Sequence, residues 1–306
     1  MANPIGAQKR REEAMAMEHL EPGVRRIVAP NPSPMTFRGT CSYVLGSGSV
    51  AVIDPGPADP AHVAAILAGL APGETVEAVL VTHAHLDHSP GARLLAAATG
   101  APVYGFGPPE AGRSAAMERL AAQGLAGGGE GVDRDFRPDL TLTHGARLAG
   151  GDWEVEAVHT PGHFGNHLSF AMGSALFSGD LVMGWASTLI SPPDGDLGDY
   201  FRSLARLETR GERVYYPGHG DPVTAPGARL AELAQHRRDR TAQILTALER
   251  RPARVADLVA AIYRDTPAAL QAAAARNVFA HLVEMTSQNL VIAAPDLHPD
   301  ALFARL

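Results

Sequence analysis

Apolar residues occur along most of the chain in short runs that predict buried strands and in longer runs at helical spacing that predict helices. Two short runs flank Gly46-Ser47-Gly48 and predict a β-hairpin over residues 42–53. A helix over 60–70 and a buried strand over 78–82 follow. The pattern then continues with a helix near 92–98 and with strands at 102–104, 153–158, 168–171, 175–177 and 214–216. Mixed α/β layering is therefore expected.

After Pro226 the apolar pattern becomes helical. The predicted helices cover 228–250, 255–263 and 268 to about 291. We therefore expect three parts, which are an N-terminal tail (1–24), a main domain (25–226) and a C-terminal helical domain (227–306).

Residues 107–131 form a less regular stretch, in which a weak helix at 111–122 precedes several glycines. The stretch is interpreted either as a mobile flap or as a plain surface insertion.

Composition narrows the function classes. The 306 residues carry a formal net charge of −7, which disfavours generic binding to nucleic acid or to anionic membranes. Cys41 is the only cysteine, so no disulfide can form within the chain, and residues 1–20 lack the apolar stretch of a signal peptide. No apolar run is long enough to cross a bilayer. A cytoplasmic protein that does not enter membranes is the expectation.

The strongest chemical signal is the segment His83-Ala84-His85-Leu86-Asp87-His88, directly after the predicted strand 78–82. The carboxyl end of a strand is where α/β proteins place ligands, and alternate residues there can converge on one metal ion. Imidazole and carboxylate groups suit zinc, with iron or manganese as alternatives. A loop that is merely rich in histidine is a weak alternative, because so many polar groups after a buried strand need mutual compensation.

Three more strand ends carry residues of the same type. Thr160-Pro161-Gly162-His163, Ser178-Gly179-Asp180 and Pro217-Gly218-His219 each follow a predicted strand. Taken singly, each His or Asp is more often a loop or core residue. Together, four strand ends that deliver ligand-type residues predict a metal site.

These motifs, in this order, resemble the metallo-β-lactamase superfamily of hydrolases over about Arg25 to Val223. The resemblance implies an αββα sandwich with two divalent metal ions at one edge of the sheets. It assigns His83, His85 and His163 to the first ion, and Asp87, His88 and His219 to the second. Asp180 would bridge both ions.

The resemblance also implies a reaction. A hydroxide shared by two cations is nucleophilic near neutral pH, so no Ser or Cys nucleophile is required. Asp87 is the candidate catalytic carboxylate that orients the hydroxide and moves its proton, with a role as a ligand alone weighed equally.

Further residues could support the metals or touch the substrate. Asp54 is expected to orient a ligand, although a turn-capping role is as plausible. His159 and His167 flank the predicted ligand His163, and His167 is the better candidate for a supporting or substrate-binding role. Trp185 is a candidate substrate contact.

Within the superfamily, the chain resembles the branch that contains lactamase-like endoribonucleases and thioesterases. Three features support this resemblance, namely the segment Asn31-Pro32-Ser33-Pro34, a helix that begins at Asp199-Tyr200, and the helical C-terminal part. In that branch the tail is a small winged-helix-like domain, which 253–306 resembles loosely, with a poor match in the final wing. Residues 29–40 and 183–195 are expected to border the crevice at the metal site. The apolar side chains that would line it are Met35, Phe37, Met183, Trp185, Leu189 and Ile190.

The preferred hypothesis is a hydrolase of a small-molecule ester, thioester or lactone, because apolar walls suit an acyl group. A metal-dependent endoribonuclease or phosphodiesterase is the alternative. The clusters that would supply its basic track are Arg237-Arg238-Asp239-Arg240 and Arg250-Arg251 with Arg254. A metal-binding regulatory protein without turnover is a third hypothesis. A small-molecule substrate is thus expected, RNA less so, and a homodimer is possible through the apolar faces of the C-terminal helices.

Overall fold

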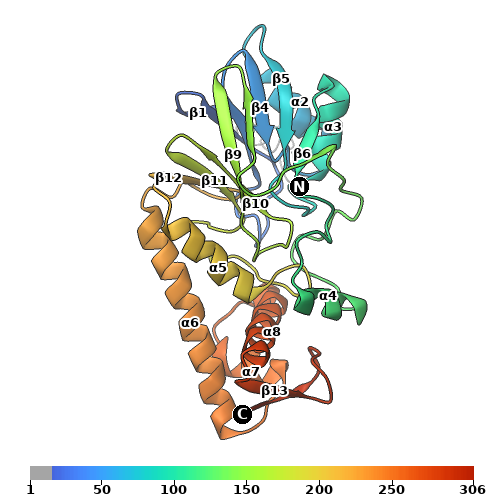
Figure 1. The fold of residues 1–306 in the computed structure, drawn as a ribbon, viewed down its shortest axis with the longest axis vertical. Coiled ribbons are helices and arrows are strands. Elements are labelled where there is room, and N and C mark those ends of the chain that lie inside the picture. The colour runs from blue at the N-terminus through green and yellow to red at the C-terminus, as the bar shows by residue number, and fades with distance from the viewer. Residues whose placement is uncertain (1–15) are drawn as a thin grey trace, which may run out of the picture.

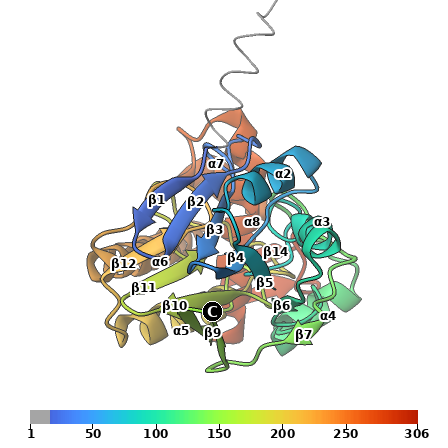
Figure 2. The same ribbon diagram turned by 90° about the horizontal axis from the view of Figure 1, so that it is seen from above.

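The computed structural model describes residues 16–306, and it consists of two β-sheets packed face to face with helices outside them (Figures 1 and 2). The first sheet has seven strands in the order β1-β2-β3-β4-β5-β6-β7, and the second has five in the order β12-β11-β10-β9-β8. The strands of the first sheet are β1 (Glu18–Glu21), β2 (Val24–Val28), β3 (Cys41–Leu45), β4 (Ser49–Ile53), β5 (Thr75–Leu80), β6 (Val103–Gly105) and β7 (Leu140–Thr141). Those of the second are β8 (Arg147–Gly150), β9 (Trp153–His159), β10 (Leu168–Met172), β11 (Ala175–Gly179) and β12 (Val214–Pro217).

The main core lies between the two sheets. Alternate residues of each strand point inward, so Tyr43 and Leu80 from the first sheet share a buried cluster with Phe170 and Phe177 from the second. The outer face of the first sheet is covered by α2 (Pro60–Ala68) and α3 (Pro90–Thr99). The outer face of the second is covered by α5 (Leu197–Glu208) and the first half of α6 (Pro226–Arg250). This layering confirms the expected αββα sandwich.

A second, smaller core holds the C-terminal part together. It joins the second half of α6 to α7 (Val255–Ile262), α8 (Gln271–Ser287) and a two-stranded antiparallel sheet of β13 (Val291–Ala294) and β14 (Leu302–Arg305). A 3-10 turn (Ala268–Leu270) precedes α8, and α4 (Ala115–Ala122) packs on this core through Met117 and Leu120. Because α6 contributes to both cores, it crosses the predicted domain boundary at residues 226 and 227 without a break.

Several elements differ from the sequence-based expectation. Residues 18–21, expected in the tail, form β1 and pair with β2, whereas residues 1–15 of that tail lie outside the described residues. The last helix ends at Ser287 and not near 291, because Asn289 adopts a left-handed φ of 56°. Val291, at the end of the predicted helix, belongs instead to β13, which with β14 forms the wing that the sequence matched poorly. Within residues 16–306 no helix is long and apolar enough to cross a membrane.

The small core gives a first prediction. Phe303 on β14 is 0% exposed and packs edge-on against Phe279 of α8, with ring centroids 6.4 Å apart. Replacing Phe303 with Ala leaves a cavity and is expected to lower the free energy of unfolding of the C-terminal part by about 3–5 kcal/mol. Leu302→Ala on the same strand, at a side chain 41% exposed, is the matched control and is expected to cost less than about 1 kcal/mol. Urea unfolding followed by circular dichroism measures both, and equal losses would show that this core is not what stabilises the wing.

Candidate metal centre

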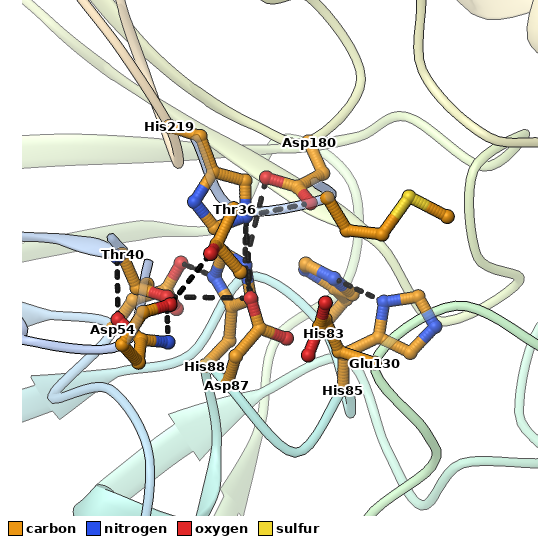
Figure 3. A network of polar contacts seen from close by, with 12 residues as sticks. Thr36, Thr40, Asp54, His83, His85, Asp87, His88, Glu130, Asp180 and His219 are labelled. Carbon is orange, nitrogen blue, oxygen red and sulfur yellow. Dashed lines mark hydrogen bonds and ion pairs between the residues drawn. The ribbon is translucent and has the colours of Figure 1, made fainter. Parts of the chain in front are cut away.

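The seven predicted ligand residues meet at one edge of the two sheets. Figure 3 labels all of them except His163. The segment 83–88 follows β5, His163 follows β9, Asp180 follows β11 and His219 follows β12. All seven side chains are buried, with exposed fractions of 6% or less. The packing of the sheets thus gathers side chains that are up to 136 residues apart in the sequence, between His83 and His219.

Ring nitrogens of three histidines converge in the first group. His85 Nδ1 lies 2.9 Å from His83 Nε2 and 3.0 Å from His163 Nε2. Among residues 16–306, these three side chains form one of the clusters whose donor atoms could hold a metal ion.

The second group combines a carboxylate with two histidines. His219 Nε2 lies 3.2 Å from Asp87 Oδ2 and 3.3 Å from His88 Nε2. Asp180 adjoins both groups, because its Oδ2 lies 3.2 Å from His219 Nε2 and 3.7 Å from His163 Nε2. The carboxylate of Asp180 therefore stands where a ligand shared between two ions would be.

The donor atoms fit divalent cations. Ligands at about 2.0–2.1 Å around a tetrahedral ion lie roughly 3.3 Å apart, which is close to the separations of 2.9–3.7 Å observed here. Asp180 Oδ1 is a buried oxygen atom with no hydrogen-bond partner, and a cation would compensate such an atom. The set contains nitrogen and oxygen donors without thiolate, which suits zinc, iron or manganese.

The two groups differ in their charge. Burial lowers the pKa of His83, His85 and His163, that of His85 to about 3, so these rings are neutral, as ligands must be. Burial also opposes charge on His219, but the carboxylates of Asp180 and Asp87 outweigh it and raise the pKa of His219 to about 10. Positive charge is therefore favoured beside Asp87 and Asp180.

The carboxylate of Asp54 supports the segment 82–88 through hydrogen bonds on the side away from the ligand atoms. Its carboxylate accepts hydrogen bonds from Thr82 N at 2.8 Å, from Thr82 Oγ1 at 2.7 Å and from His88 Nδ1 at 2.8 Å. Thr82 Oγ1 in turn lies 2.9 Å from His83 Nδ1. Because these bonds occupy the outer ring nitrogens, they aim His83 Nε2 and His88 Nε2 at the site. The contacts favour the supporting role of Asp54 over turn capping.

The other histidines are oriented in the same way. His163 Nδ1 lies 2.7 Å from Leu189 O and 2.8 Å from Thr188 Oγ1, and His219 Nδ1 lies 3.2 Å from Gly39 O. The loop that carries Thr188 and Leu189 therefore controls how His163 faces the site.

His167 and His159 lie outside the ligand groups. His167 is 0% exposed, its Nδ1 lies 2.9 Å from Thr160 Oγ1, and its Nε2 accepts from Asp180 N at 3.2 Å. It therefore supports the backbone of Asp180 and is not placed to touch a substrate. His159 stacks on Phe106, with ring centroids 3.9 Å apart, and lies away from the ligand atoms.

A cavity of about 260 Å³ opens onto the ligand groups. Four of the expected apolar walls line it, namely Met35, Met183, Trp185 and Leu189. Phe37 does not line the cavity but stacks on Trp185, with centroids 4.8 Å apart. Ile190 was predicted wrongly, because it is 0% exposed and packs in the core under the second sheet.

Two contributions to the cavity were missed by sequence reasoning. Glu130, labelled in Figure 3, lines it and accepts a hydrogen bond of 2.6 Å from Ser33 Oγ. The C-terminal part supplies six lining residues, which are Tyr263, Thr266, Leu270, Ala273, Ala274 and Asn277. The sequence carries no local signal for these, because their place depends on how distant segments pack.

Residues 35–219 of this chain match the metallo-beta-lactamase superfamily, a range that contains all seven predicted ligands. The chain belongs to this superfamily. Residues 255–298 also match the beta-lactamase-associated winged helix domain, a range that contains α7, α8 and β13.

Known members of the superfamily resemble most of this chain. The beta-lactamase-like protein 2 homolog of Drosophila melanogaster is 31% identical and covers 89% of this chain and 91% of its own length. The atrochrysone carboxyl ACP thioesterase of Aspergillus fumigatus is 28% identical over 80% of this chain and 71% of its own. A crystal structure of a beta-lactamase domain protein from Burkholderia ambifaria, 23% identical, has the same fold with a TM-score of 0.78 over 96% of this chain and 94% of its own.

The bonds of Asp54 give a second prediction for this superfamily member. Asp54→Asn keeps the side-chain size, and Asn tolerates the φ of 46° at this position. It removes the carboxylate charge that orients His88, so the affinity for zinc is expected to fall about 10–100-fold. Competition with a chromophoric chelator measures this affinity. Asp152→Asn, at a carboxylate bonded to Ser47 on the surface, is the control, and an equal loss in both variants would contradict the role of Asp54.

A third prediction concerns acid stability. His62 is 0% exposed, its Nε2 donates to Ser42 Oγ at 2.9 Å, and burial lowers its pKa from 6.5 to about 4. Between about pH 6.5 and pH 4 the unfolded chain therefore binds a proton at His62 that the folded chain does not. The free energy of unfolding is accordingly unaffected by the titration of this residue above about pH 6.5, and it falls as the pH decreases to about 4. His62→Gln keeps a hydrogen-bond donor to Ser42 that does not titrate. In this variant the free energy of unfolding is expected to fall by about 2–3 kcal/mol less on acidification than in the wild type. Urea unfolding between pH 4.5 and 8 tests this, and parallel curves for variant and wild type would rule it out.

Proposed function

We propose that this protein is a metal-dependent hydrolase of a small-molecule acyl thioester, ester or lactone. The observation that carries the proposal is the convergence of seven buried ligand-type side chains beside a cavity with largely apolar walls. His83, His85 and His163 would hold one divalent ion, and Asp87, His88 and His219 the other, with Asp180 between them. Zinc is the proposed metal, with iron or manganese as alternatives. If bound by these residues, two divalent ions would lower the pKa of a water molecule and would polarise the substrate carbonyl.

The chain's own residues would orient the reaction. Asp87 lines the cavity, and its Oδ2 is held by Thr40 Oγ1 at 3.3 Å, whereas its Oδ1 has no partner. We propose that Oδ1 accepts a hydrogen bond from the attacking water and so aims it at the carbonyl carbon. The Asp54 bonds and the 188–189 loop would keep the histidine rings in place during this step.

The cavity supports an acyl substrate. Met35, Met183, Trp185 and Leu189 offer apolar contacts, as does Leu270 from the C-terminal part. One relative carries the name of an acyl carrier protein thioesterase, which is in line with this substrate class.

The phosphodiesterase alternative has less support. A phosphate backbone needs a basic track, yet Arg237 is 1% exposed, and the guanidinium groups of Arg238 and Arg240 stack on Phe201 and Tyr263. Arg250 and Arg251 lie at the far end of α6 from the sheets (Figure 1).

The proposal is tested by metal analysis together with hydrolysis assays of acyl thioesters, lactones, a phosphodiester and RNA, with and without chelator. About two metal ions per chain and chelator-sensitive hydrolysis of an acyl substrate are expected. Asp87→Asn is expected to lower kcat by about 10²–10⁴-fold, and Asp239→Asn, at an exposed carboxylate of α6, is the control with unchanged kcat.

The other hypotheses have distinct outcomes. Hydrolysis of RNA or the phosphodiester without any acyl substrate would replace the proposal by the phosphodiesterase alternative. Less than one metal ion per chain, not restored by zinc, iron or manganese, would favour a binding protein without turnover.

A further inference from the structure

The helix α8 occupies an unusual place for a winged-helix domain. In helix-turn-helix proteins the second helix of the pair lies in the major groove and reads the bases. Here α7 and α8 form that pair, and β13 and β14 follow as the wing. Eight residues of α8 are buried, which are Ala274, Val278, Phe279, Ala280, His281, Leu282, Val283 and Met285. A helix buried to this extent has little surface to offer a nucleic acid.

Both sides of α8 are covered by protein. Val278 and Leu282 pack with Leu258 and Phe303 in the core of the C-terminal part. Ala280 packs in the core beneath the second sheet. The helix α8 therefore lies between the β-sandwich and the core of the C-terminal part. Figure 1 shows it beside α5 and α6.

The part of α8 nearest its N-terminus faces the candidate active site. Leu270, Ala273, Ala274 and Asn277 line the same cavity as His85 and the other ligand-type residues. Asp87 Oδ1 and Asp180 Oδ1, which are buried and without hydrogen-bond partners, belong to residues of that cavity. The metal-binding side chains and α8 are thus two walls of one cavity.

Polar contacts tie α8 to the remaining walls. Asn277 Oδ1 accepts from Ile190 N at 3.1 Å and from Arg237 Nη1 at 3.1 Å. Arg276 Nη1 donates to Ala126 O at 3.0 Å and to Ser191 Oγ at 3.1 Å. These bonds reach the 188–191 loop and the segment 126–130, which both contribute to the cavity. The position of α8 relative to the metal-ligand groups is therefore set by specific contacts.

We propose that the winged-helix domain selects the acyl group of the substrate, and that Ala273 on α8 sets the length of acyl chain that fits. The proposal rests on the function proposed above. It gives the C-terminal domain a role in substrate selection in place of nucleic-acid binding. At roughly 30 Å³ for a group the size of water, a cavity of about 260 Å³ has room for an acyl chain of about eight carbons. Ala273→Leu adds three carbon atoms to the cavity wall, which removes roughly a third of the cavity volume.

The test compares Ala273→Leu with Ala272→Leu. Ala272 is exposed and does not line the cavity, so both variants carry the same change on neighbouring residues of one helix. The metal-loaded full-length proteins are assayed with acetyl and octanoyl thioesters of N-acetylcysteamine. Ala273→Leu is expected to lower the ratio of kcat/KM for octanoyl over acetyl at least 10-fold, and Ala272→Leu to leave it unchanged.

A binding measurement separates this proposal from the proposed function. Trp185 lines the cavity, whereas Trp153 is buried in the main core, so octanoate that enters the cavity is expected to change the fluorescence of Trp185. Ala273→Leu is expected to raise the Kd of octanoate at least 10-fold while Ala272→Leu does not. If this difference holds but no acyl thioester, ester or lactone is hydrolysed, the function proposed above fails and the role of α8 in binding acyl chains stands.

Three results would overturn the role of α8. The first is that Ala273→Leu lowers kcat/KM equally for acetyl and octanoyl substrates, and the second is that it leaves the Kd of octanoate unchanged. The third is tight binding of a fluorescent single-stranded RNA that competes with octanoate and is weakened by Ala273→Leu.

Discussion

Compensation of buried charge is the constraint on which the site depends. Asp54, Asp87 and Asp180 are each at least 94% buried, and carboxylates in such a place are costly unless cations or donors surround them. Imidazole rings occupy that surrounding shell, and their outer nitrogens are held by Thr82, Leu189 and Gly39. The site is therefore a network in which each group needs its neighbours, so a cation bound there would stabilise the folded chain as well as take part in chemistry.

The two sheets provide this network with a rigid base. Each ligand-type residue follows the end of a core strand, so packing between the sheets determines the distances between ligand atoms. A second set of contacts runs from the C-terminal domain, where Arg237 donates to Thr188 O and Thr188 Oγ1 contacts His163 Nδ1. The orientation of one predicted ligand thus depends on a buried guanidinium more than 70 residues away in the sequence, in a helix shared by both cores.

The αββα sandwich and the convergence of the seven ligand-type residues could be predicted from the sequence, because strand periodicity and dense motifs at strand ends are local signals. The sequence left the role of Asp54 open between support of a ligand and turn capping, whereas four of the six expected apolar residues line the cavity. A winged-helix-like domain was expected, but the strands of its wing were not located, because Val291 continues the apolar pattern of α8 and only the backbone at Asn289 separates the helix from β13. Ile190, Glu130 and the wall from α8 depend on contacts between distant segments, for which a single sequence holds no periodic signal.

The shared cavity has a consequence for how such a protein can diversify. The groups that would perform the chemistry lie in residues 83–219, whereas part of the wall that meets the substrate lies in residues 263–277. Because these are separate stretches of sequence, a change at a cavity-lining position of α8 such as Ala273 can alter which molecule is admitted, provided that Arg237 and Asn277 keep their contacts with the 188–190 loop. That wall of the C-terminal domain would then act as a variable template for recognition beside a reaction centre that stays the same.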